Sequence, residues 1–267
     1  MNSLRLMASW DRKLERTEEH LRALAKAIET FIATDPYAVT VKKEADGAEH
    51  VYCFSKFTDP PDSIGILAGD AVHNLRSALD HIVFASAQQG ARAAGTTMSR
   101  SQERSIQFPI TSSTEQFEDQ IGRHRLRYVE PEIKTFIERL QPYWLSPGQP
   151  DRSWIAIINE LDVIDKHRTI PALGTVVSYY AFTAPAGMEQ PEIIPSRVTT
   201  GWGLDAEIVR YRFSEPHPEV DLEFNPTFTV SLDGAWPPTR AADVLLRGFA
   251  QHVRDLVIDP LDLRLNT

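Results

Sequence analysis

Apolar residues in the first part of the chain recur at intervals that predict two long helices. Between residues 8 and 34, Leu14, Leu21 and Ile28 repeat every seven positions. This spacing places them in one stripe along a helix, and such a stripe needs a partner helix to cover it. The second helix is predicted at about 62–89, after the turn and N-cap residues of the stretch DPPDS.

A β-hairpin is predicted between these helices, and further helices after them. Two β-rich runs within residues 39–57 flank an Asp-Gly pair, which is a strong hairpin signal. The small, polar and basic residues at 90–105 predict an exposed loop. The stretch FPI that follows is expected to be extended. Additional helical patterns lie at about 114–122, 130–140 and 152–168.

From residue 175 the pattern changes to the alternation that is typical of strands. An antiparallel sheet is predicted from the stretches TVVSYYAFTA, AEIVRYRF, VDLEF and TFTVSLDG. A closing helix follows the double proline of WPPTR and is expected to end at Pro260. The predicted fold class is α+β, as a single domain over 1–267, because no convincing linker is present. Its helical part covers about 1–172, and its β-rich part with the closing helix covers about 173–267.

Composition narrows the function classes. The net charge of −9 argues against broad non-specific binding to nucleic acid, although RHRLR at 123–127 is a candidate basic patch. Cys53 is the single cysteine, so an internal disulfide and a four-thiolate zinc site are excluded. No apolar run approaches the roughly 18 residues of a membrane span. We therefore expect a cytoplasmic protein with no membrane partner.

One side of the predicted second helix carries an unusual set of polar residues. It lacks lysine and glutamate, which usually cover a solvated helix face, and has short side chains and histidines that suit fixed hydrogen bonds. This composition favours a buried or cleft-lining face over a freely solvated one. Its members are Asp70, His73, Asn74, Ser77, Asp80 and His81.

A second polar cluster lies near the end of the helix predicted at 152–168. Two interpretations stand beside each other. The cations can simply cover the last carbonyl groups of the helix, where positive charge is favourable. Alternatively, this helix packs beside the 62–89 helix, so that Asp162 or Asp165 pairs with Arg76 and His167 joins the same layer. The cluster consists of Asp162, Asp165, Lys166, His167 and Arg168.

The stretches HNLRSALDH, FPI, QPY and LDVIDKHR together resemble a family of uncharacterised bacterial proteins across residues 64–170. That resemblance implies membership and no chemistry. Within it, Arg76 and His81 match the Arg-x4-His pattern of HEPN ribonucleases, helical bundles that often form homodimers. This second resemblance implies cleavage of RNA without a metal or other cofactor. Arg76 would stabilise charge on the phosphate, and His81 would exchange a proton with the ribose 2′-hydroxyl.

Two other hypotheses remain open. Asp70-x-x-His73 has the carboxylate-x-x-His spacing of helical di-metal proteins. The partner motif is missing, however, because Ile164 stands three residues before His167; no metal is therefore predicted. In the other hypothesis the protein is not an enzyme but binds a ligand or partner. The polar helix face is then a structural hydrogen-bond network that includes an Arg76–Asp80 pair.

Overall fold

The computed structural model describes residues 8–178, 189–195, 202–219 and 226–266. It confirms the α+β fold class. Contacts divide the chain into two compact units, and both are discontinuous in sequence. The helical unit consists of residues 1–23, 66–170 and 243–267, and the β-rich unit consists of residues 24–65 and 171–242.

The division predicted near residue 172 thus lies beside the boundary between Ile170 and Pro171. The sequence did not indicate that the predicted hairpin at 39–57 belongs with the later strands.

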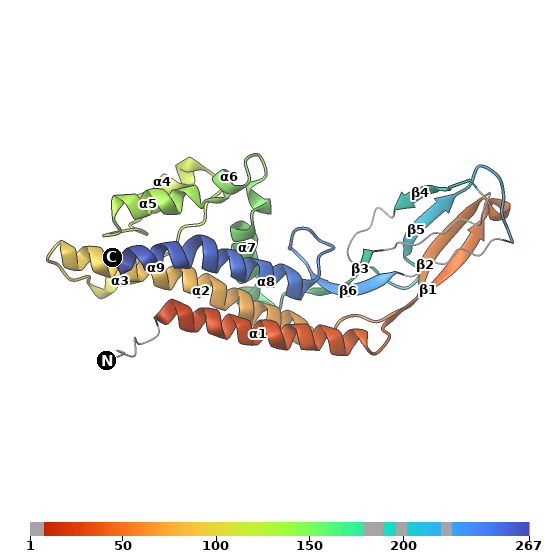
Figure 1. Ribbon diagram of the computed structural model, residues 1–267, viewed down its shortest axis with the longest axis horizontal. Coiled ribbons are helices and arrows are strands. Elements are labelled where there is room, and N and C mark those ends of the chain that lie inside the picture. The colour runs from red at the N-terminus through yellow and green to blue at the C-terminus, as the bar shows by residue number, and fades with distance from the viewer. Residues whose placement is uncertain (1–7, 179–188, 196–201, 220–225, 267) are drawn as a thin grey trace. The chain divides into compact units, whose positions relative to one another are not determined.

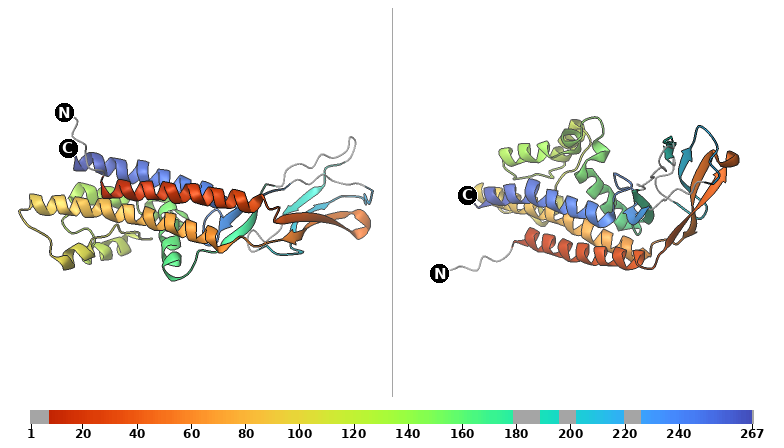
Figure 2. Two further views of the ribbon diagram at one scale, coloured as in Figure 1. Left: turned by 90° about the horizontal axis from the view of Figure 1, so that it is seen from below. Right: turned by 45° about the vertical axis from the view of Figure 1, so that its right-hand side comes forward.

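Two long helices and a closing helical segment run side by side in the ribbon views (Figures 1 and 2). The predicted apolar stripe of the first helix is confirmed, since Leu14 and Leu21 are almost fully buried. The helical segments are α1 (Ser9–Ile32), α2 (Asp62–Ala93), α3 (Arg100–Ser105), α4 (Thr114–Gly122), α5 (Pro131–Arg139), α6 (Pro142–Leu145), α7 (Trp154–His167), α8 (Ala242–His252), the π-helical turn η3 (Val253–Ile258) and α9 (Asp259–Leu265). In the described part of the chain, no helix is long and apolar enough to cross a membrane.

α2 has the amphipathic division that its sequence predicts. All of the apolar residues on its core side are inaccessible to solvent, so this face is the centre of the helical packing. They are Ala71, Val72, Leu75, Ala78, Leu79, Ile82 and Val83. The polar side of the same turns is therefore held at a fixed position against its surroundings.

The sequence predicts that the closing helix ends at Pro260, but the helix continues beyond this residue. Proline has no N–H to donate, and its ring conflicts with the carbonyl four residues earlier. The chain accommodates this in the π-helical turn η3, after which α9 continues through Pro260 to Leu265. A π-helical turn adds one residue to the helical ring and so removes the conflict without a break.

The loop expected at 90–105 is largely helical. α2 extends to Ala93, and α3 starts after Ser99. The side chain of Ser99 accepts a hydrogen bond from the backbone of Gln102, and the Gln102 side chain accepts one from Ser99. This capping box stabilises a short helix whose small, polar composition alone indicates a loop.

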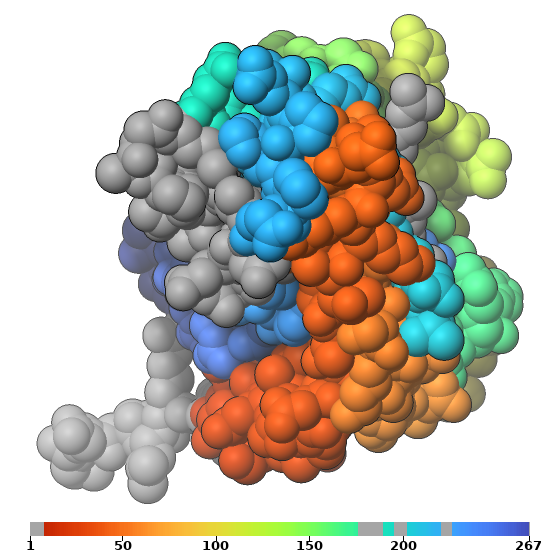
Figure 3. Space-filling view, turned by 90° about the vertical axis from the view of Figure 1, so that its right-hand side faces the viewer, coloured from red at the N-terminus to blue at the C-terminus, as the bar shows by residue number. Residues whose placement is uncertain are grey.

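The described residues of the β-rich unit form two antiparallel sheets, with strand orders β1-β2-β5-β4 and β3-β6. The predicted hairpin is confirmed: its turn is a short 3₁₀ segment, Ala45–Gly47, and Figure 3 shows the hairpin in orange beside β5 in light blue. The strands are β1 (Tyr37–Glu44), β2 (Glu49–Phe57), β3 (Ala172–Ser178), β4 (Glu192–Pro195), β5 (Glu207–Arg212) and β6 (Thr227–Leu232). The predicted strand VDLEF and the second half of TVVSYYAFTA lie outside the described residues.

Candidate functional site

The polar residues predicted along α2 form one face with two different surroundings. Its middle lies against other segments of the helical unit, whereas its first turns reach solvent. Asn74 is buried, Arg76, Ser77, Asp80 and His81 are half-buried, and Asp70 and His73 are exposed. The two regions therefore need separate description.

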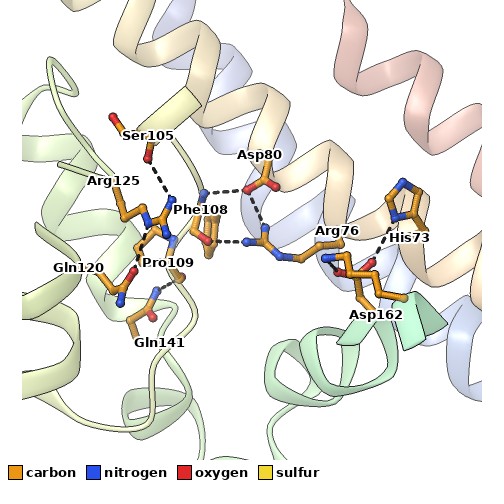
Figure 4. A network of polar contacts seen from close by, with 11 residues as sticks. His73, Arg76, Asp80, Ser105, Phe108, Pro109, Gln120, Arg125, Gln141 and Asp162 are labelled. Carbon is orange, nitrogen blue, oxygen red and sulfur yellow. Dashed lines mark hydrogen bonds and ion pairs between the residues drawn. The ribbon is translucent and has the colours of Figure 1, made fainter. Parts of the chain in front are cut away.

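In the middle region, Arg76 binds the chain segment that follows α3. Its guanidinium donates to Asp80 at 2.7 Å and to the backbone carbonyl of Phe108 at 2.8 Å, and the N–H of Phe108 donates to the same Asp80 oxygen at 2.8 Å (Figure 4). The predicted i, i+4 pair with Asp80 is formed. The expected pair between Arg76 and Asp162 or Asp165 is not. With a side chain only 12% exposed, Arg76 is largely committed to this contact.

A second buried side chain holds the same segment a few residues later. The amide oxygen of Gln141 accepts from the N–H of Thr111 at 3.0 Å and from its hydroxyl at 3.1 Å. The amide nitrogen donates to the carbonyl of Pro109 at 2.9 Å (Figure 4) and to that of Ile137 at 3.0 Å. The backbone of residues 108–111 is thus hydrogen-bonded to side chains, whereas in a sheet a neighbouring strand would supply these partners.

In the exposed region, α7 contributes the counterpart of His73. Asp162 is buried, with 1% of its side chain exposed, and its carboxylate accepts from His73 Nδ1 at 3.2 Å and from Lys166 Nζ at 2.5 Å (Figure 4). A carboxylate can only accept, so Nδ1 is the donor in this contact, and in the neutral imidazole Nε2 then carries the lone pair. The imidazole is 51% exposed. A buried aspartate thus orients a histidine that solvent reaches.

Asp165 approaches α2 at Gly69, where no side chain blocks it. A Cβ atom at Gly69 would lie 1.9 Å from Asp165 Oδ1. Burial raises the pKa of Asp165, and the neighbouring carboxylates of Asp70 and Asp162 raise it further, while His73 lowers it. When several carboxylates lie close together in a partly buried site, their mutual repulsion favours protonation of one of them. Asp165 is thus a weaker acid than an ordinary aspartate.

Sequence reasoning missed the contribution of α1. Lys13 Nζ donates to the Asn74 side chain at 3.2 Å, and His20 Nδ1 lies 3.6 Å from Asp70. A signal was present in the sequence, because these two residues are seven positions apart. The structure shows in addition that Thr17 between them is fully buried. A buried threonine in a charged stretch indicates that the face is covered, so His20 and Lys13 lie beside the α2 helix and not on a solvated side.

The remaining predicted residues stand apart from this contact network. His167 and Arg168 are exposed, as expected for a plain helix end, and the Arg168 N–H caps the Ile164 carbonyl. His81 Nδ1 is buried without a hydrogen-bond partner in the part of the chain described. The contacts described place no hydrogen bond between Arg76 and His81, and Arg76 is directed to Phe108.

The described residues do not form a metal site. No group of three or more histidine, cysteine, aspartate or glutamate side chains among them could hold a metal ion. The spacing of Asp70 and His73 therefore has no third ligand to complete it. What the arrangement offers instead is two histidine–aspartate contacts, His73 with Asp162 and His20 with Asp70, close to a protonatable carboxyl group.

The chain matches no family model, and no curated protein or solved structure is similar to it at a significant level. The geometry of the helical unit is therefore the basis of a functional assignment.

Proposed function

We propose that the exposed end of the α2 polar face is an acid–base site centred on His73. The observation that carries this proposal is the contact between His73 and Asp162. The buried Asp162 carboxylate contacts Nδ1 of the half-exposed imidazole at 3.2 Å. The other ring nitrogen, Nε2, is then the one that can accept a proton from a substrate. A histidine oriented in this way is the usual form of a general base near neutral pH.

The reaction we propose is cleavage of RNA without a metal. The ribose 2′-hydroxyl is an internal nucleophile, so the site needs only a base, an acid and a cation for the phosphate. His73 takes the 2′-hydroxyl proton, the 2′-oxygen bonds to phosphorus, and the bond to the 5′-oxygen breaks. Asp165 gives its proton to that leaving oxygen, and Lys166 lies beside the phosphate. The products are a 2′,3′-cyclic phosphate and a 5′-hydroxyl end, and solvent then returns both groups to their starting protonation.

This proposal moves the chemistry away from the Arg-x4-His pair of the HEPN resemblance. Arg76 already donates to Asp80 and to Phe108, so binding a phosphate would cost those contacts. A homodimer stays a prediction of that resemblance, which sedimentation of the purified chain tests. We assign the chain to the bacterial cytoplasm, where RNA is present and a buried free thiol such as Cys53 remains reduced.

A structural role is the second candidate. Asp162 is 1% exposed and contacts two basic side chains, an arrangement that also fixes the register of α7 against α2. In that case His73 and Lys166 satisfy a buried carboxylate and bind no substrate. Variants of His73 would then change stability and nothing else.

The decisive experiment follows a fluorescent single-stranded RNA in the presence of EDTA. We expect the wild type to release cyclic-phosphate ends and His73→Ala to cleave about 10²–10⁴-fold more slowly, with free imidazole restoring part of the rate. His167→Ala is the matched control, because this exposed histidine ends α7, the helix that carries Asp162.

Four outcomes would decide against the proposal. RNA left intact by the folded wild type would reject it. A His73→Ala rate equal to that of the wild type would move the chemistry elsewhere, and loss in His81→Ala alone would restore the Arg-x4-His pair. A lower melting temperature in His73→Ala with no RNA cleavage by the wild type would support the structural role.

A further inference from the structure

A cavity of about 710 Å³ lies in the helical unit where α1 begins and α9 ends, far along α2 from His73. From His73 to Arg92 the helix rises about 28 Å at roughly 1.5 Å per residue. The volume is within the range of small-molecule sites. Seven of its ten lining residues carry polar groups: Trp10 and Asp11 from α1, Gln88, Gln89 and Arg92 from α2, Asp262 from α9 and Asn266 directly after it, with Ala8, Ala85 and Leu265 as the apolar remainder.

The carboxylates of Asp11 and Asp262 both line this cavity, with little nearby positive charge and few hydrogen-bond donors. Burial raises the pKa of Asp11, and the nearby Asp262 raises it further, with Arg254 as the opposing charge. Within the described residues no side chain donates a hydrogen bond to Asp11, and Asp262 accepts one from the Asn266 amide at 2.9 Å. A pair of partly desolvated carboxylates gains most from a ligand that brings positive charge and N–H donors.

The other lining groups need acceptors. Arg92 is exposed and forms no ion pair with a carboxylate in the described part of the chain. The indole Nε1 of Trp10 is buried and has no acceptor there either, although buried donors in proteins are nearly always bonded. The cavity therefore combines unsatisfied acceptors with unsatisfied donors, which neither a simple amine nor a simple acid would match.

We propose that this cavity binds a small zwitterion whose ammonium group lies against Asp11 and Asp262 and whose anionic group lies against Arg92. The ammonium group brings positive charge and N–H donors to these two carboxylates. A carboxylate or phosphate can accept two hydrogen bonds from the guanidinium fork, and this adds directional selectivity. Gln88 and Gln89 carry both donors and acceptors and can bind the atoms between the two ends. The inference does not depend on RNA cleavage at His73.

The test uses ω-amino acids of increasing length as probes, because the separation of the two charges is the unknown quantity. Glycine, 4-aminobutyrate and 6-aminohexanoate are titrated into the full chain and followed by the indole N–H resonance of Trp10, which Trp10→Phe identifies. Butylamine and butyrate carry one charge each and serve as controls. We expect one amino acid to bind saturably and at least tenfold more tightly than either control.

Variants decide whether binding takes place at this cavity. Asp11→Asn and Arg92→Gln should each weaken the best probe at least tenfold, whereas Arg100→Gln, an exposed arginine on α3, should leave its affinity unchanged. The proposal is overturned if no amino acid of the series binds more tightly than about 10 mM. It is also overturned if butylamine or butyrate binds equally well, or if Asp11→Asn binds like the wild type.

Discussion

The backbone N–H of Phe108 donates a 2.8 Å hydrogen bond to Asp80, although 28 positions separate the two residues. The same carboxylate oxygen accepts from Arg76, and Arg76 donates to the Phe108 carbonyl. One arginine–aspartate pair on α2 thus satisfies both polar groups of a single peptide residue. A neighbouring strand normally supplies these partners, so the pair attaches the segment before α4 to the helix in place of a sheet.

We predict that Arg76→Ala lowers the free energy of unfolding by about 2–3 kcal/mol, because it leaves the Asp80 carboxylate and the Phe108 carbonyl without their donor. Arg76→Lys should recover only part of the loss, since one ammonium group cannot reproduce two separately directed N–H groups. Urea unfolding followed by circular dichroism measures both changes.

The control for this prediction is Arg16→Ala. Arg16 pairs with Glu19 three residues later, and both side chains are more than half exposed. Such a pair contributes within about 0.5 kcal/mol. If Arg76→Ala were no more destabilising than Arg16→Ala, the attachment of Phe108 to α2 would have no energetic role.

Gln141 provides a second prediction for the same segment. Gln141→Ala should cost about 2–4 kcal/mol, because four buried hydrogen bonds lose their common partner. Gln141→Glu should be at least as harmful, since a carboxylate oxygen would face the carbonyls of Pro109 and Ile137. Gln149→Ala, an exposed glutamine bonded to Arg152, is the control in the same unfolding assay. Wild-type stability in Gln141→Glu would contradict the assigned amide orientation.

Local patterns predicted the parts of this site that one helix determines. The Arg76–Asp80 pair follows from spacing along a single helix. The composition of the α2 polar face favoured a buried or cleft-lining face, which holds for its middle but not for the exposed Asp70 and His73. The partner of Asp162 could not be obtained in this way. Periodicity gives the face on which Asp162 lies but not the register of α7 against α2, and a shift of one turn decides between Arg76 and His73.

His20 and Pro260 show two further limits. His20 stands among charged residues that read as a solvated face, and only contact with α2 gives it a partner in Asp70. Pro260 is normally a reliable end of a helix, but the packing of α9 favours continuation, and a π-helical turn accommodates the missing N–H. In both cases tertiary contacts outweigh the local preference.

Gly69 supplies a prediction about the approach of α7. In Gly69→Ala the new Cβ would lie 1.9 Å from the Asp165 carboxylate, so that side chain must rotate away from α2. We expect a net loss of about 1 kcal/mol, because this displacement exceeds the helical preference of alanine over glycine. Adding Asp165→Ala to Gly69→Ala should remove the penalty, and a double-mutant cycle by thermal unfolding measures the coupling.

Gly248→Ala is the matched control for that cycle. Gly248 lies within α8, and nothing stands within 4 Å of the position of its Cβ. Alanine should therefore raise the free energy of unfolding by about 0.5–1 kcal/mol there. Equal stabilisation by Gly69→Ala would show that Asp165 does not hold its position against α2.

The last prediction concerns the pH dependence that Asp165 confers. Burial and the carboxylates of Asp70 and Asp162 raise its pKa in the folded chain above the ordinary value of 3.8. The folded state therefore binds this proton more tightly than the unfolded state, and its contribution to stability is lost as pH rises from 3.8 through the raised pKa. Asp165→Asn removes a carboxyl group whose ionisation disfavours the folded state, so this variant should be more stable than the wild type at pH 7. The difference should shrink as pH falls and disappear below pH 3.8. Unfolding curves between pH 3.5 and 7 test this, with Asp151→Asn at an exposed aspartate as the control. If the difference in stability instead grows toward low pH, Asp165 is stabilised as a carboxylate and cannot supply the proton proposed for it.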